Sequence, residues 1–110
     1  MSRIEIIELP RIYDPRGCLS VAEERSHIPF DIKKVEWKHI GIIHSDAPME
    51  LEHSSMMLIA LAGEISIQVI DEARTITLNR PNQALILREG CRSRITHSTR
   101  QSLLLTIHQK

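Results

Sequence analysis

The feature that most constrains the fold is an alternation of apolar and polar side chains with a period of two residues. In GEISIQVID, Ile65, Ile67 and Val69 alternate with polar residues, and in RTITLN the apolar members are Ile76 and Leu78. Successive side chains of a strand point to opposite faces of a sheet, whereas the apolar positions of a helix recur every three or four residues. The pattern therefore predicts strands that bury one face and expose the other.

Shorter apolar runs of the same type recur along the chain, and turn signals such as DPRG, SDAP, LAGE and NRPNQ separate nearly all of them. All five prolines fall between the predicted strands, where a missing N–H group removes no hydrogen bond from a sheet. No stretch has the pattern of an amphipathic helix longer than one or two turns. Many short strands in 110 residues predict one all-β domain over residues 1–110, built as an antiparallel sandwich or small barrel.

Charge and hydropathy argue against two classes of partner. Lysine plus arginine equals aspartate plus glutamate at 14 each, so the basic excess of a nucleic-acid-binding protein is missing. The longest apolar stretch, MMLIALA, is far shorter than the roughly 20 residues of a membrane-spanning helix, and the N-terminus has no signal-peptide pattern. We therefore expect a cytoplasmic protein that binds neither nucleic acid nor a membrane.

Two motifs in the N-terminal third occur together in one known protein family. DPRGCL begins at Asp14 and matches a D-x-R-G-x-L turn, and IPFDIKKVEW runs from Ile28 to Trp37 and matches a strand that begins I-P-F-x-I-K. In this order they resemble the WxcM-like cupins, which include the dTDP-sugar 3,4-ketoisomerases. LIALAGEISIQVIDE and LNRPNQALIL are similar in pattern to later stretches of the family, so the resemblance covers most of the chain.

The resemblance implies an all-β, single-domain cupin: an antiparallel jelly-roll β-barrel, commonly a homodimer, whose open end binds a nucleotide-linked 4-keto-6-deoxy sugar. It also implies an isomerase reaction that moves the carbonyl group of the sugar between C4 and C3 by proton transfer, without a metal or other cofactor. The implied partner is a second copy of the chain or a related cupin, and the implied setting is the synthesis of bacterial surface polysaccharides.

One strand departs from the family pattern. Before the glycine of the LAGE corner, the family carries R-G-x-H-x-H, whose arginine contacts the nucleotide sugar and whose two histidines are its acid/base pair. Counting back from Gly63 without a gap, the arginine position holds Asp46 and the two histidine positions hold Met49 and Leu51. Proton-transfer groups typically contribute about 10² to 10⁴ in rate each, so their loss predicts a non-catalytic relative.

Strand parity gives the candidate ligand-binding residues. Met49, Leu51, His53 and Met57 share the same parity, so the simplest pleat points them all into the barrel, as a repacked apolar core or as the lining of an apolar pocket. Glu50 falls on the opposite parity and is expected to face solvent or a partner subunit, unless a one-residue bulge inverts this assignment. His53 is expected to be a hydrogen-bonded structural residue or, alternatively, a relocated base.

Arg16, in the DPRG turn, has two interpretations. It is either part of a tight turn built around the following glycine or a contact to the pyrophosphate of a nucleotide sugar. No metal site is expected, because a metal-binding cupin needs an H-x-H pair and the chain contains none.

Three functional hypotheses follow. The first is a non-catalytic binding or partner module in nucleotide-sugar metabolism. The second is an active 3,4-ketoisomerase that uses His53 or Glu50 as a relocated base and Arg16 as an anchor. The third is a cupin that binds an unrelated small ligand in an open pocket lined by Met49, Leu51 and Met57.

Overall fold

The computed structural model describes residues 4–52 and 54–110, and nearly all of their regular structure is β-strand. The described strands are β1 (Ile4–Glu8), β2 (Arg11–Asp14), β3 (Gly17–Ser20), β4 (Ile32–Ile40), β5 (Met49–Glu50), β6 (Met56–Ala62), β7 (Ile65–Val69), β8 (Arg74–Leu78), β9 (Gln83–Leu87), β10 (Ser93–Ser98) and β11 (Ser102–Gln109). One 3₁₀ turn, η1 (Ile70–Glu72), joins β7 to β8. Among the described residues, no helix is long and apolar enough to cross a membrane.

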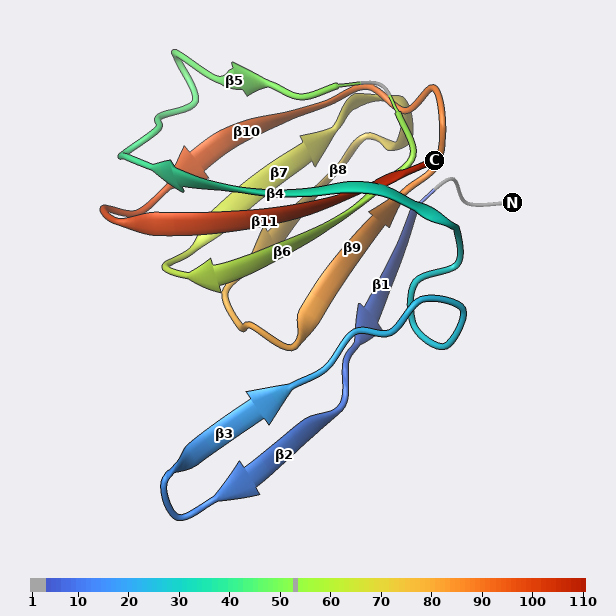
Figure 1. Ribbon diagram of the computed structural model, residues 1–110. Coiled ribbons are helices and arrows are strands. Elements are labelled where there is room, and N and C mark those ends of the chain that lie inside the picture. Colours follow the sequence, from blue (N-terminus) through green and yellow to red (C-terminus); the bar gives the residue numbers. More distant parts are fainter. Residues whose placement is uncertain (1–3, 53) are drawn as a thin grey trace.

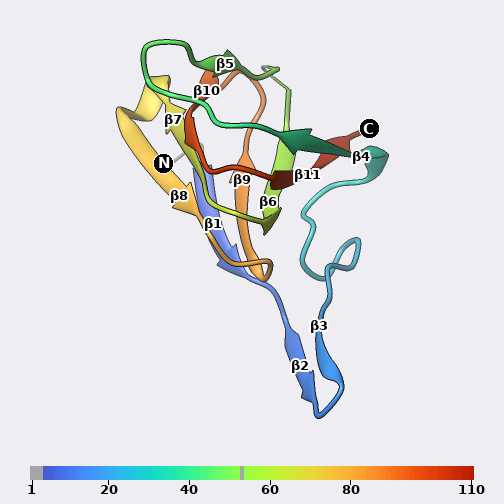
Figure 2. The ribbon, with the colours of Figure 1, turned by 90° about the vertical axis from the view of Figure 1, so that its left-hand side faces the viewer.

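The strands form two main sheets that face one another (Figures 1 and 2). A five-stranded sheet has the order β1-β9-β6-β11-β4, and a four-stranded sheet has the order β5-β10-β7-β8. Every strand pair in them is antiparallel. In the part of the chain that is described, no strand pairing closes the two sheets into a continuous barrel. The predicted all-β antiparallel architecture is confirmed, with the barrel left open.

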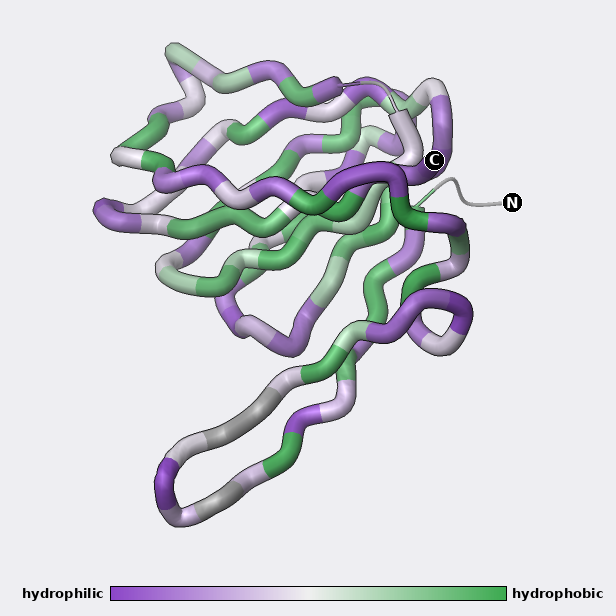
Figure 3. Tube along the Cα trace, in the orientation of Figure 1, coloured by the Kyte–Doolittle hydropathy of each residue, from purple (hydrophilic) through white to green (hydrophobic). Residues whose placement is uncertain are grey.

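The inner core fills the space between the two sheets. Ile65, Ile67 and Val69 on β7 are fully buried there, together with Ile76 and Leu78 on β8, the residues whose alternation predicted these strands. The rest of this cluster is aliphatic or sulfur-containing: Ile4, Ile40, Met56, Leu58, Ala60, Leu85, Leu87, Cys91, Ile95 and Leu104. Figure 3 shows the hydrophobic residues gathered along the central strands, while most loops are hydrophilic.

A second core covers the outer face of the five-stranded sheet. Leu9, Ile28 and Phe30, from the segments that flank the β2–β3 hairpin, pack against outward-facing side chains of β6, β9 and β11. Burial of both faces explains why Met56–Ala60 is one continuous apolar run rather than an alternating one.

Met57 does not face the interior as its parity predicted. It lies in the outer core with Ile59, whereas Met56 and Leu58 occupy the inner core, and Leu61 is partly exposed on the outer side. The reason is that β5 and β6 belong to different sheets. The chain crosses from one sheet to the other between these strands, so the parity of β5 does not continue into β6.

The β2–β3 hairpin projects away from both sheets (Figures 1 and 2). Its strands pair only with each other among the described residues, and Ile12 and Tyr13 are 56% and 74% exposed. An isolated two-stranded hairpin is at best marginally stable in water, and this one exposes apolar side chains.

Candidate functional site

A small pocket opens between the two sheets, where β5 and the residues after it lie over β4 and β11. Its volume is about 60 Å³. That is room for a few water molecules, well below the roughly 300 to 1,000 Å³ of ordinary small-molecule sites. The residues that line it are Glu36, Lys38, Met49, Glu50, Leu51, Glu52, Met56, Leu104, Thr106 and His108.

On one side of the pocket the apolar residues Met49 and Leu51 alternate with the carboxylates Glu50 and Glu52, and the opposite side is polar. Met49 lies opposite Ile95 of β10 and is 37% exposed, and Leu51 is half-buried against the inner core. Across the pocket, β4 supplies the carboxylate of Glu36 and the ammonium group of Lys38, and β11 supplies the hydroxyl of Thr106 and the imidazole of His108.

The register of β4 with β11 explains why this polar side faces inward. Thr106 pairs directly with Glu36, and Leu104 pairs with Lys38. Leu104 is part of the inner core, and Thr106 and His108 follow it at two-residue intervals, so all three side chains share its face. Direct cross-strand partners also share a face, which brings Glu36 to the same side of the sheet.

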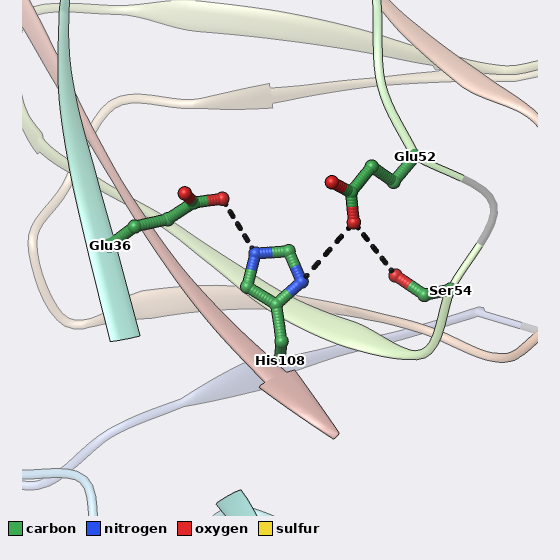
Figure 4. A network of polar contacts seen from close by, with 4 residues as sticks. All are labelled: Glu36, Glu52, Ser54 and His108. Carbon is green, nitrogen blue, oxygen red and sulfur yellow. Dashed lines mark hydrogen bonds and ion pairs between the residues drawn. The ribbon is translucent and has the colours of Figure 1, made fainter. Parts of the chain in front are cut away.

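His108 is buried between two carboxylates that come from different parts of the chain (Figure 4). Its Nε2 atom lies 2.7 Å from Oε1 of Glu36, and its Nδ1 atom lies 3.7 Å from Oε2 of Glu52. The hydroxyl group of Ser54 donates a hydrogen bond of 3.4 Å to the same oxygen of Glu52. Only 5% of the His108 side chain is exposed, so the imidazole is reached through the pocket.

The environment of Glu36 stabilises its charged form. The hydrogen bond from His108 holds the pKa of the Glu36 carboxyl below its usual value, against a smaller opposing effect of desolvation. The positive charges of Lys34 and Lys38 on the same strand act in the same direction as the hydrogen bond. Glu36 is therefore an ionised acceptor near neutral pH, suited to hold the imidazole ring in one orientation.

The structure brings together some of the residues that the sequence singled out. Met49, Glu50 and Leu51 all line the pocket, and Glu50 also lies 3.8 Å from Arg94 in an exposed ion pair. Met57 lies on the other face of its sheet. His53 is outside the described residues.

Arg16 lies in the turn between β2 and β3 and does not line the pocket. Figure 1 shows this turn at the tip of the projecting hairpin, at the opposite end of the molecule from β5. Its side chain is exposed. Within one chain, therefore, Arg16 and the pocket do not form a single site.

Glu36 and His108 were not selected by sequence reasoning. They are 72 residues apart, and no motif links a glutamate inside KKVEWKHI to a histidine near the end of the chain. The spacing of the histidines gave no reason to prefer His108 over the others. Within the described residues, no group of three histidine, cysteine or acidic side chains is arranged to hold a metal ion.

Comparison with known proteins places the chain in a family. The family model described as "FdtA: WxcM-like, C-terminal" matches residues 2–110. A search of curated proteins finds no match. Among solved structures, a double mutant of the QdtA 3,4-ketoisomerase from Thermoanaerobacterium thermosaccharolyticum, in complex with TDP, is 27% identical with a TM-score of 0.85, covering 100% of this chain and 82% of the other.

A second solved structure gives the same picture. The WlaRB TDP-quinovose 3,4-ketoisomerase from Campylobacter jejuni is 25% identical with a TM-score of 0.85, and the match covers 100% of this chain and 87% of the other. A Mycobacterium tuberculosis rmlC epimerase, at 12% identity and a TM-score of 0.76, shares the fold alone. The fold matches the cupin-type ketoisomerases, and the chain belongs to the WxcM-like family.

Proposed function

We propose that this chain binds a nucleotide-linked sugar at the pocket between its two sheets, and that Met49 and Leu51 supply none of the chemistry. The observation that carries this proposal is the identity of these two residues. Met49 and Leu51 stand at the pocket where the resemblance expects the histidine pair, and neither side chain can transfer a proton. The complex of a similar ketoisomerase with TDP supports the class of ligand.

The size of the pocket limits how such a ligand is seated. At about 60 Å³ the interior does not hold a hexose ring. The ring would rest at the mouth, against the exposed parts of Met49 and Glu50, and present one edge to the polar side. The nucleotide would remain outside the pocket. Recognition of one edge is enough for a binding module in surface-polysaccharide sugar metabolism, and it requires no catalytic residue.

We further propose that the partner is a second copy of this chain and that the two copies exchange their β2–β3 hairpins. The exposed Ile12 and Tyr13 make the hairpin apolar on both faces. An apolar groove of about 430 Å³ lies on the outer face of the five-stranded sheet, lined by Leu9, Ser20, Val21, Ala22, Ile59, Leu61, Pro81, Leu105 and Ile107.

The outer face of β4 continues this apolar surface. Val35 and Trp37 are 44% and 63% exposed, and Trp37 lies beside Leu105 of the groove. In a two-fold dimer, the hairpin of each copy would cover this surface of the other copy. The same contact would then be made twice. A related cupin that displays the same hairpin is the alternative occupant.

Titration calorimetry with TDP and with TDP-4-keto-6-deoxyglucose tests the binding proposal. We expect saturable binding of both, with a tighter dissociation constant for the sugar nucleotide. Met49→Trp should weaken binding of the sugar nucleotide at least tenfold, because an indole fills the mouth of the pocket. Ile42→Trp is the matched control, since Ile42 is an exposed loop residue that does not line the pocket.

Absence of binding by the unaltered protein would refute the proposal. Equal loss of affinity in the two tryptophan variants would refute the placement at the pocket.

One observation favours a second candidate function: the buried contact between His108 and Glu36 gives the polar side a group that can transfer protons.

A further inference from the structure

We propose that His108 is the proton-transfer residue of this pocket, with Glu36 as its positioning residue. The acid/base chemistry would then sit on β4 and β11, opposite the strand on which the family resemblance expects it. This inference rests on the proposed binding of a nucleotide-linked sugar, because the proton that His108 takes belongs to that ligand. It assigns the relocated base to a residue other than Glu50 or His53.

The contact with Glu36 fixes the ring and its hydrogen. A carboxylate only accepts hydrogen bonds, so the 2.7 Å contact has the imidazole donating from Nε2 to Glu36. In the neutral ring the lone pair is then on Nδ1. The same arrangement, in which a carboxylate holds a histidine in one tautomer, orients the general base of Ser-His-Asp enzymes.

The Nδ1 atom is available to a ligand. Oε2 of Glu52 lies 3.7 Å from it, which is beyond hydrogen-bonding range. No hydrogen bond to Nδ1 is formed by the part of the chain that the structure describes. A general base needs such an unused acceptor within reach of the proton that it removes.

The surroundings of His108 suit the creation of a positive charge on its ring. Glu36 approaches from β4 and Glu52 from the segment after β5, while Lys38 lines the same pocket at a position two residues beyond Glu36. Thr106 and Met56, also in the pocket lining, carry no charge. The carboxylates of Glu36 and Glu52 are placed to stabilise the positive charge that develops on the ring during proton transfer.

The volume of the pocket suits this chemistry better than it suits a whole sugar. A space of about 60 Å³ accepts a carbonyl group and the carbon next to it, while the rest of the ring stays at the mouth. Met49, Leu51 and Leu104 surround that space and limit the access of water. A ketose edge held there would place a C–H group beside the imidazole.

The step is the enolisation of a 4-keto sugar. Nδ1 of His108 takes the proton from C3, and the electron pair of the broken C3–H bond forms a C3=C4 double bond. The π pair of the C4 carbonyl moves to its oxygen, which takes a proton from water at the mouth of the pocket. The products are the enediol, an imidazolium held by Glu36, and hydroxide. Reversal in heavy water returns deuterium to C3.

The experiment follows this exchange by proton NMR, with TDP-4-keto-6-deoxyglucose as the probe in heavy water. We expect the protein to exchange the C3 proton, and His108→Gln to slow the exchange at least 100-fold while its affinity for TDP stays within threefold. His44→Gln is the matched control, because His44 is an exposed loop histidine outside the pocket, and it should exchange at the rate of the unaltered protein.

Glu36→Gln provides a second measurement that does not depend on the folding of the His108 variant. A positioning role predicts that the maximal exchange rate falls at least tenfold while the half-saturating ligand concentration changes little. A merely structural role would change both or neither. Tight binding without exchange by the unaltered protein, or undiminished exchange by His108→Gln, would overturn the inference and leave the proposed binding intact. A protein that binds no TDP ligand would instead overturn the proposed function.

Discussion

Oε1 of Glu36 on β4 lies 2.7 Å from Nε2 of His108 on β11, across the strand pair that forms one edge of the five-stranded sheet. The two residues are 72 positions apart in the sequence. Within the described pocket lining, their side chains are the only pair within hydrogen-bonding distance of one another. The contact therefore fastens the edge strand β4 to β11 at the pocket.

The first prediction concerns acid. Because His108 lowers the pKa of Glu36 in the folded protein, the ionised carboxyl contributes stability above its unfolded pKa of about 4.5, and that contribution is lost as pH falls through the lower folded value. Glu36→Gln should thus lose less stability than the unaltered protein between pH 5 and pH 3. About a third of the Glu36 side chain is exposed, so we expect a difference below about 1 kcal/mol.

Urea unfolding at a series of pH values measures this difference. The two free energies of unfolding should run parallel above pH 5 and converge below it. Curves that stay parallel down to pH 3 would show that the hydrogen bond does not favour the ionised form of Glu36.

How far the sequence predicts this structure depends on the range of the interactions. Ile76 and Leu78 bury one face of β8 as their alternation indicated, because that pattern records a local property of the strand. The predicted orientation of Met57 was wrong, because the chain passes from one sheet to the other between β5 and β6. The sequence pattern gave no indication of this change of sheet.

The candidate site shows the same division. Met49 and Leu51 were selected by counting back from Gly63 along the family pattern, and both line the pocket. Its polar side depends on the register between β4 and β11, which sets Thr106 opposite Glu36 and so brings His108 within reach. The register between two strands so far apart in the sequence is set by packing and by the turns. No local motif in a single sequence indicates it.

The second prediction concerns the corner at Gly63. This residue has a φ angle of +74°, and a Cβ atom on it would lie 2.9 Å from the Cα atom of Ser102 and 2.8 Å from the hydroxyl of Thr99. Gly63→Ala therefore combines an unfavourable backbone conformation with a clash against backbone, and should lower the free energy of unfolding by more than about 2 kcal/mol.

Gly41→Ala is the matched control, because a Cβ atom on Gly41 meets nothing within 4 Å. Its midpoint in chemical denaturation should stay close to that of the unaltered protein. Similar midpoints for the two variants would mean that the β6–β7 corner yields easily to a methyl group.

The third prediction concerns assembly. If the β2–β3 hairpin docks on the apolar groove of a second copy, Tyr13→Asp should convert a dimer into a monomer, because it places a charge where the exposed ring of Tyr13 would become buried in the dimer. Ile42→Asp changes another exposed apolar residue that belongs to neither surface, and it should leave the dimer intact. Light scattering after gel filtration gives the mass of each species directly. A monomeric unaltered protein, or a dimer that survives Tyr13→Asp, would argue against hairpin exchange.

The fourth prediction tests Met49 and Leu51 by placing at these positions the histidines that the family resemblance expects. Met49 and Leu51 are two residues apart and both line the pocket, so histidines at these positions would face the same space. If the pocket seats the edge of a 4-keto sugar, Met49→His with Leu51→His should raise C3 exchange at least tenfold above the unaltered protein, because each base adds a route for proton transfer.

The double variant should also lose stability, since Leu51 packs against the inner core and an imidazole replaces that apolar contact. Combining it with His108→Gln separates the two sides of the pocket: exchange that persists in the triple variant comes from the new histidines. A folded double variant that binds TDP but shows no gain in C3 exchange would mean that the edge of the sugar does not reach positions 49 and 51. In that case, the apolar residues there serve packing alone.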